Sequence, residues 1–178
     1  MQPFAGAQRP VYNAVAEPNG GEPATLLNRV ATRLLFNIGP PIQKNMITNP
    51  ELSSRLAEQL KREQSVPLTV TMTCHVCDDA LPQTQHIRYA SEKGSSEIAE
   101  FHIVPDLDVA QQRKAQSISF SIRRNNVELD FLNVPVRIQT APRETSKAHS
   151  FRCIPNLGPD DPSIDLVVEL VRDFRSGL

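Results

Sequence analysis

A chain of 178 residues suits a single domain of about 100 to 150 ordered residues. Apolar residues make up 39% of it and aromatic residues only 5%, with no Trp, so we expect a core built from aliphatic side chains. Its 19 basic residues against 20 acidic ones give no overall field that would attract nucleic acid or an anionic membrane surface, and both kinds of partner are disfavoured.

The start of the chain and its cysteines bear on its compartment. No run approaches the roughly 18 apolar residues that a membrane helix needs, and the N-terminus lacks the basic-then-apolar order of a secretory signal. Cys74, Cys77 and Cys153 are too few, and odd in number, for a secreted disulfide scaffold, so reduced thiols are expected. The sequence therefore predicts a cytoplasmic protein.

The first 65 residues predict an arm followed by helices. Residues 1–23 hold four prolines and three glycines with no regular apolar spacing, which is typical of a flexible arm. Residues 24–37 are predicted to be an amphipathic helix, because their apolar residues fall at helical offsets. Those residues are Leu26, Leu27, Val30, Leu34 and Leu35. Residues 24–65 as a whole are predicted to be a helical lead-in packed on the domain that follows.

A second helix is predicted to begin just after Thr48 or Asn49, either of which can cap it. Its apolar stripe consists of Leu52, Leu56 and Leu60. The stripe is narrow and the remaining positions are mostly charged, which places the helix on a surface, over a sheet or against a partner.

From Pro67 the apolar period changes from helical to two, which indicates strands with one buried face. Three such segments are predicted, over residues 67–76, 83–90 and 98–104. Residues 106–116 are predicted to be a polar connection without a regular element.

A hairpin is predicted from residue 117 onward. Residues 117–123 alternate apolar side chains with serines, and Asn125-Asn126 is a two-residue turn able to adopt positive φ. The return strand changes its apolar parity, which predicts a bulge near residue 132. Pro135 cannot donate a hydrogen bond to a neighbouring strand, so it indicates an edge position.

These segments favour a mostly β fold, an immunoglobulin-like antiparallel β-sandwich with one or two N-terminal helices. The sandwich is assigned to residues 66–178, with its last strand over residues 164–171. Little chain follows that strand, so the domain is expected to be cut short at its C-terminal end. The assignment depends on the number and spacing of strands.

Cys74 and Cys77 form a CxxC, which makes a zinc site one alternative. Tetrahedral zinc needs two more ligands. The candidates are His75, His86, His102, His149 and Cys153. A single CxxC is weak evidence for metal, because cysteines also serve as small buried residues.

A Cys-His hydrolase is the second alternative. It needs a thiol, a histidine within reach and donors for an oxyanion, and Cys153 with His75 or His86 could supply the first two. No glycine-rich surround presents Cys153, and the sequence carries no recognisable active-site motif. The chain is therefore predicted not to be an enzyme and to need no cofactor.

Three segments together resemble a known β-sandwich module of bacterial multidomain proteins. They read IAEFHIVP from Ile98, SISFSIRRNNVEL from Ser117 and VPVRI from Val134. That module often stands beside caspase-like CHAT protease domains in conflict or signalling systems. The resemblance implies a non-catalytic module within a larger bacterial system, and it carries over no catalytic residue.

The sequence as a whole predicts a protein-interaction or scaffolding module without catalytic activity. The surfaces expected to bind a protein partner or a flanking domain are the stripe Leu52, Leu56 and Leu60 and the strand edge at Pro135.

Overall fold

A computed structural model of the chain describes residues 9–140, 153–155 and 166–168. The chain divides into two units, Met1–Ala141 and Pro142–Leu178. The described part of the second unit is one antiparallel pair, β11 (Cys153–Pro155) with β12 (Leu166–Val168). All other described elements belong to the first unit.

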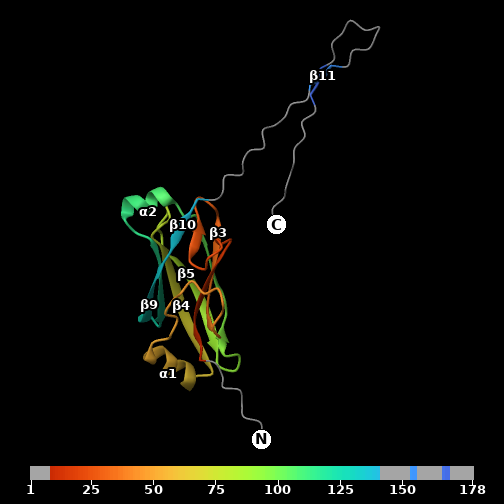
Figure 1. Cartoon of the computed structure of the whole chain (residues 1–178). Coiled ribbons are helices and arrows are strands. Elements are labelled where there is room, and N and C mark those ends of the chain that lie inside the picture. The colour runs from red at the N-terminus through yellow and green to blue at the C-terminus, as the bar shows by residue number, and fades with distance from the viewer. Residues whose placement is uncertain (1–8, 141–152, 156–165, 169–178) are drawn as a thin grey trace. The chain divides into compact units, whose positions relative to one another are not determined.

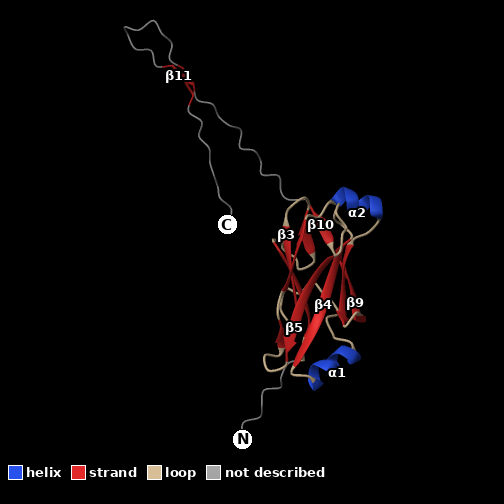
Figure 2. Ribbon diagram, turned by 180° about the vertical axis from the view of Figure 1, so that it is seen from behind, coloured by secondary structure: helices blue, strands red, loops and turns tan. Residues whose placement is uncertain are grey.

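The first unit consists mainly of strands, which confirms the prediction of a mostly β fold (Figure 1). Its strands are β1 (Val11–Glu17), β2 (Thr25–Leu27), β3 (Thr32–Gly39), β4 (Ser65–Cys74), β5 (Gln83–Ala90), β6 (Ser95–Ser96), β7 (Ala99–Ile103), β8 (Ser117–Arg124), β9 (Val127–Pro135) and β10 (Arg137–Gln139). Its helices are α1 (Ser54–Arg62) and α2 (Leu107–Arg113), and they lie at opposite ends of the strands (Figure 2).

Two antiparallel sheets share one core. One sheet has the order β1-β3-β7 and the other the order β6-β5-β4-β8-β9. The ring centroid of Phe120 on β8 lies 5.0 Å from that of Phe36 on β3 and 6.1 Å from that of Phe101 on β7. These contacts cross from one sheet to the other, so the inner faces of the two sheets pack together.

The core is mainly aliphatic, as the composition predicted, and it contains one cluster of aromatic rings. Tyr12, Phe36, Phe101 and Phe120 are all fully buried. Aromatic side chains are scarce in the sequence, but these four lie in contact, and each large ring buries much apolar surface.

The period-two pattern correctly predicted several strands. On β4 the even-numbered residues are buried and their neighbours are more exposed. The buried set is Val66, Leu68, Val70, Met72 and Cys74. Strands β5 and β7 also fall within their predicted segments, and β8 extends one residue beyond its own. Asn125 and Asn126 have φ of 49° and 64°, which confirms the two-residue turn between β8 and β9.

The prediction for the N-terminal residues was wrong in two places. Residues 11–17, assigned to the flexible arm, form β1, whose Tyr12, Ala14 and Ala16 are buried. Residues 24–37, assigned to a helix, contain β2 and most of β3. Strand β3 lies between β1 and β7, and these two neighbours supply the hydrogen bonds that a helix would make internally.

Both helices are short and capped by side chains. Ser53, rather than Thr48 or Asn49, caps α1, and its Oγ accepts a hydrogen bond from Leu56 N at 3.2 Å. Helix α2 lies in the segment predicted to be a polar connection and is capped by the Asp106 carboxylate. No helix in the described part of the chain is long and apolar enough to cross a membrane.

The last strands of the unit run from the five-stranded sheet to a separate two-stranded sheet. The register between β8 and β9 shifts between Ile122 and Arg123, so that Leu129 is the extra residue. The bulge is therefore earlier than the predicted position near residue 132. Beyond Pro135 the chain leaves β8, and β10 pairs in parallel with β2. The final strand of the unit thus joins one of its first.

A buried polar contact ties β9 to the N-terminal half. The Tyr12 hydroxyl donates a hydrogen bond to Asp130 Oδ2, and Ser53 N donates to the same oxygen at 3.1 Å. Asp130 therefore holds together β1, the start of α1 and β9. Burial, together with this hydrogen bond, raises the pKa of Tyr12 well above its ordinary value.

At alkaline pH Tyr12 is expected not to ionise before the protein unfolds. Burial also raises the pKa of Tyr89, the second tyrosine of the chain. A raised folded-state pKa contributes stability that is complete below the unfolded pKa of about 10 and is lost as pH rises further. The part of the absorbance at 295 nm that belongs to Tyr12 should therefore appear only together with the loss of far-ultraviolet circular dichroism. Two tyrosines that titrate near pH 10 in the folded chain would contradict this.

Candidate functional site

The helix stripe predicted to bind a partner packs instead on the protein's own core. Leu56 and Leu60 are 0% and 4% exposed, and Leu52 is partly buried against the same core. The prediction of a partner site on these residues was therefore wrong. An amphipathic pattern shows that one face of a helix is covered, but it does not identify the covering surface.

Pro135 lies where the sequence predicted, at the edge of a sheet. It is exposed and ends β9, the outermost strand on its side of the five-stranded sheet. An edge strand leaves its outer backbone N–H and C=O groups unpaired, unless another part of the protein covers them. The other sheet edges show how this chain covers them.

The outer edge of β1 is covered by the segment that precedes α1. Tyr12 N donates a hydrogen bond to Pro50 O at 2.8 Å, and Met46 N donates to Ala14 O at 2.9 Å. The Asn45 side chain completes the cover, since its Nδ2 donates to Tyr12 O and its Oδ1 accepts from Ala14 N. This edge cannot accept a further strand at these residues.

Strand β7 is covered by one side chain. Gln83 Nε2 donates to His102 O at 2.6 Å, while His102 N donates to Gln83 Oε1 at 3.1 Å. At the far edge of the five-stranded sheet, β6 is only two residues long. Strand β9, by contrast, is nine residues long and pairs with β8 alone. Among the described residues, the backbone of Val127–Pro135 forms hydrogen bonds with no backbone group outside β8.

The open edge also carries exposed apolar side chains. Phe131 is 59% exposed and Val127 is 46% exposed. Phe131 pairs across the strands with Ser121, on the outer face of the sheet. We define the β9 edge as the outer side of Val127–Pro135 together with these two side chains.

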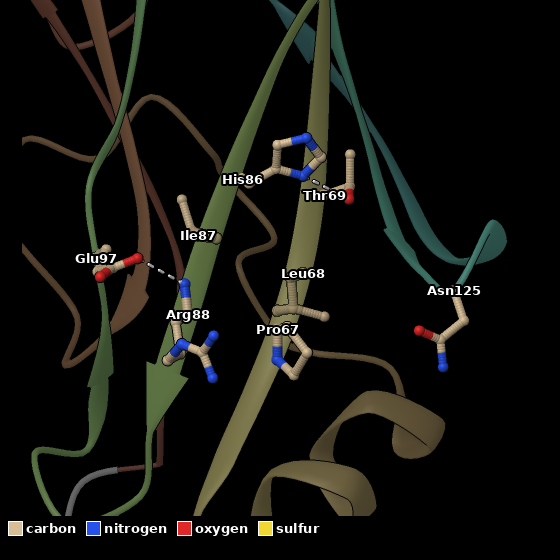
Figure 3. A pocket seen from close by; sticks show the side chains of 8 residues that line it. All are labelled: Pro67, Leu68, Thr69, His86, Ile87, Arg88, Glu97 and Asn125. Atoms are coloured by element: carbon tan, nitrogen blue, oxygen red, sulfur yellow. Dashed lines mark hydrogen bonds between the residues drawn. The ribbon is translucent and has the colours of Figure 1, made fainter.

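Two small depressions adjoin the turn at Asn125, each of about 190 Å³. The first, the face crevice, lies on the outer side of the five-stranded sheet, and Figure 3 shows its lining. His86 Nδ1 lies 3.1 Å from Thr69 Oγ1 there, and Arg88 N donates to Glu97 Oε2 at 3.0 Å. These contacts run across neighbouring strands.

The second depression, the helix crevice, lies between α1 and the start of β9. It is lined by Arg55, Gln59, Arg124, Asn125, Val127 and Leu129. Arg124 is held by Glu63 at the end of α1, with Nη1–Oε1 and Nη2–Oε2 distances of 2.6 and 2.8 Å. The hydrogen bonds from Arg124 lower the pKa of the Glu63 carboxyl.

Both crevices are smaller than the roughly 300 to 1,000 Å³ of ordinary small-molecule sites. A volume of about 190 Å³ can accept a side chain of another protein but cannot enclose most of a cofactor. The geometry around Asn125 is therefore suited to contact with a polypeptide.

The CxxC forms a disulfide in this structure, which corrects the expectation of reduced thiols. Cys74 and Cys77 are bonded, with their Cα atoms 5.5 Å apart. Strand β4 ends at Cys74, and the turn that follows brings Cys77 back toward it. Both residues are buried. A disulfide removes both thiolates that the predicted zinc site required, so that alternative does not fit this structure.

The described histidines that were predicted as zinc ligands do not gather around this pair, and His149 lies outside the described residues. His75 Nε2 lies 3.0 Å from Ser119 Oγ on the outer face of the sheet. Cys153 belongs to β11 of the second unit, and its side chain lies outside the described residues. Across the residues that the structure describes, no three His, Cys, Asp or Glu side chains cluster as metal ligands do. The hydrolase alternative, which depends on Cys153, stays an untested prediction.

The sequence did not predict the most useful feature of the site, which is the contrast between the open edge of β9 and the covered edge of β1. A scan against models of known protein families finds no match to this chain, and a search of curated proteins finds no significant relative.

Proposed function

We propose that the first unit is a non-catalytic interaction module that binds an extended segment of a partner protein along the β9 edge. The observation that carries this proposal is that β9 is long and open, while β1 and β7 are covered by other parts of the chain. Addition of a strand to an open edge supplies backbone hydrogen bonds, and neighbouring pockets for side chains supply specificity.

The strand order supports the finer prediction of an immunoglobulin-like module. If β1, β3, β4, β5, β7, β8 and β9 are lettered A, B, C, C′, E, F and G, one sheet reads A-B-E and the other reads C′-C-F-G, with the two-residue β6 beside C′. Variable-type immunoglobulin domains distribute the same strands between their sheets. Such domains commonly serve as recognition modules, which agrees with the interaction role. A place in a bacterial multidomain system, suggested by the sequence resemblance, is part of the same proposal.

The proposal is tested by selecting ligands from a library of displayed, random ten-residue peptides. Selected peptides are expected to bind the wild-type chain and to slow hydrogen exchange at the backbone amides of β9, because a new strand protects an open edge. Phe131→Lys should weaken this binding about ten-fold or more, since it replaces an apolar contact with a charge of the kind that blocks edge pairing.

Leu81→Lys is the matched control, because Leu81 is 72% exposed but lies in a turn away from β9. It should bind the selected peptides as the wild type does. Peptides that bind both variants equally well and leave the β9 amides unprotected would exclude the β9 edge as the binding surface.

A further inference from the structure

The polar residues that line the helix crevice are either positively charged or neutral. Its two charged residues are Arg55 and Arg124, and its two carboxamides belong to Gln59 and Asn125. No carboxylate lines it. Its apolar wall consists of two β9 residues, Val127 and Leu129, so the crevice adjoins the β9 edge directly.

Arg124 has one donor without an acceptor. Glu63 occupies both terminal nitrogens of the guanidinium, and Gln59 Oε1 accepts a third contact at 3.3 Å. Nε of Arg124 is buried, and no described protein atom accepts its hydrogen. A buried donor left without a partner is costly, so an acceptor that entered with a small movement of the Arg124 side chain would satisfy it.

From these two observations we propose that the helix crevice binds an acidic side chain of the segment that pairs with β9, with an aliphatic residue beside it on the same face of that segment. The carboxylate is the acceptor for the two arginines, and the aliphatic side chain covers Val127 and Leu129. The inference rests on the proposed function, because it assigns the chemistry of the same partner segment.

The assignment follows from charge and shape together. Carboxylates match the planar guanidinium of arginine, and no carboxylate lines the crevice itself. Glu63 already pairs with Arg124, so Arg55 supplies most of the attraction. Residues two positions apart on a strand point to the same side, so an acidic and an aliphatic side chain can enter together. The attraction is partly exposed to solvent and should weaken with added salt.

The same displayed library tests this inference. Peptides selected on the wild-type chain should be enriched in Asp or Glu next to an aliphatic residue. A selected synthetic peptide and its counterpart with Gln or Asn for the acid are then titrated against the full chain. Arg55→Gln should weaken binding of the acidic peptide about five-fold and leave binding of the amide peptide unchanged, because Arg55 is exposed and makes no contact that folding requires.

Arg62→Gln is the matched control on the same helix. Arg62 is exposed, pairs with Glu58 and does not line the crevice, so this variant should bind both peptides as the wild type does. A charge exchange adds a gain of function: Arg55→Glu should reject the acidic peptide and bind better a peptide carrying Lys at that position.

The outcomes separate the two proposals. Selected peptides whose binding depends on Phe131 but which show no preference for acidic residues would overturn the inference. They would still support the β9 edge as the binding surface. Acidic peptides that depend on Arg55 but not on Phe131 would support the crevice and overturn strand addition. A library that yields no binder to the wild-type chain would count against both.

Discussion

Phe120→Ala is expected to lower the free energy of unfolding by about 3 to 5 kcal/mol. Phe120 is fully buried and packs against Phe36 and Phe101 of the opposite sheet. The substitution removes these contacts and leaves a cavity at the one place where the two sheets meet through aromatic rings, and close-packed neighbours can fill it only in part. Urea melts of the purified variants measure the loss.

Ser117→Ala is the control for this substitution. Ser117 lies on the same strand, is only partly buried and makes no side-chain hydrogen bond among the described residues, so its loss should stay within about 0.5 kcal/mol. Ser119 is not a suitable control, because it is buried and its Oγ lies 3.0 Å from His75 Nε2. Similar losses of unfolding free energy for Phe120→Ala and Ser117→Ala would contradict the assignment of Phe120 to the buried face of β8.

Asp130→Ala is expected to cost about 3 kcal/mol of unfolding free energy. The change leaves the buried Tyr12 hydroxyl without its acceptor and removes the oxygen that Ser53 N binds. Unpaired buried donors cost about 1 to 3 kcal/mol each, and hydrogen bonds to charged groups lie at the upper end. Denaturant melts again provide the measurement.

A double-mutant cycle separates this contact from other effects. Tyr12→Phe removes the hydroxyl but keeps the ring, so it should cost about 1 kcal/mol. The double variant should be more stable than the sum of the two losses predicts, by about 1 to 2 kcal/mol, because no unpaired hydroxyl remains. Strictly additive losses would mean that Tyr12 and Asp130 do not interact.

The sequence correctly predicted those strands whose apolar residues fit only one period. Strand β4 alternates strictly and its inward set is buried throughout, so no helical interpretation competes with it. The turn at Asn125 and Asn126 was also predictable, because Asn is one of the few residues other than Gly that adopt positive φ.

Residues 24–37 failed because their apolar residues fit two periods. Leu34 and Leu35 both suit a helix, yet only Leu34, in step with Phe36 and Ile38, is buried. The deciding factor was the pairing of β3 with β1 and β7, which a local pattern cannot contain. Strand β1 was not predicted, because its inward residues include the small Ala14 and Ala16, which give only a weak apolar alternation.

The candidate site was less predictable than the fold. Pro135 was correctly placed at an edge, because the missing N–H of proline disfavours a position that is paired on both sides. That β9 stays open while β1 and part of β7 are covered depends on Asn45 and Gln83, which reach those two edges from distant segments. The Cys74–Cys77 bond likewise depends on the turn after β4, which the spacing alone does not determine.

The contact between Tyr12 and Asp130 joins residues that are 118 positions apart, and β10 closes on β2 over a similar span. During synthesis, therefore, β1 and β3 leave the ribosome long before β8 and β9 can cover their inner face. Proteins dominated by such distant pairings fold slowly, because a large loop must close before the contacts stabilise it. For the time that translation takes to reach residue 140, the apolar side of the first hairpin is exposed to other chains and to chaperones, which makes this interval the period of greatest aggregation risk.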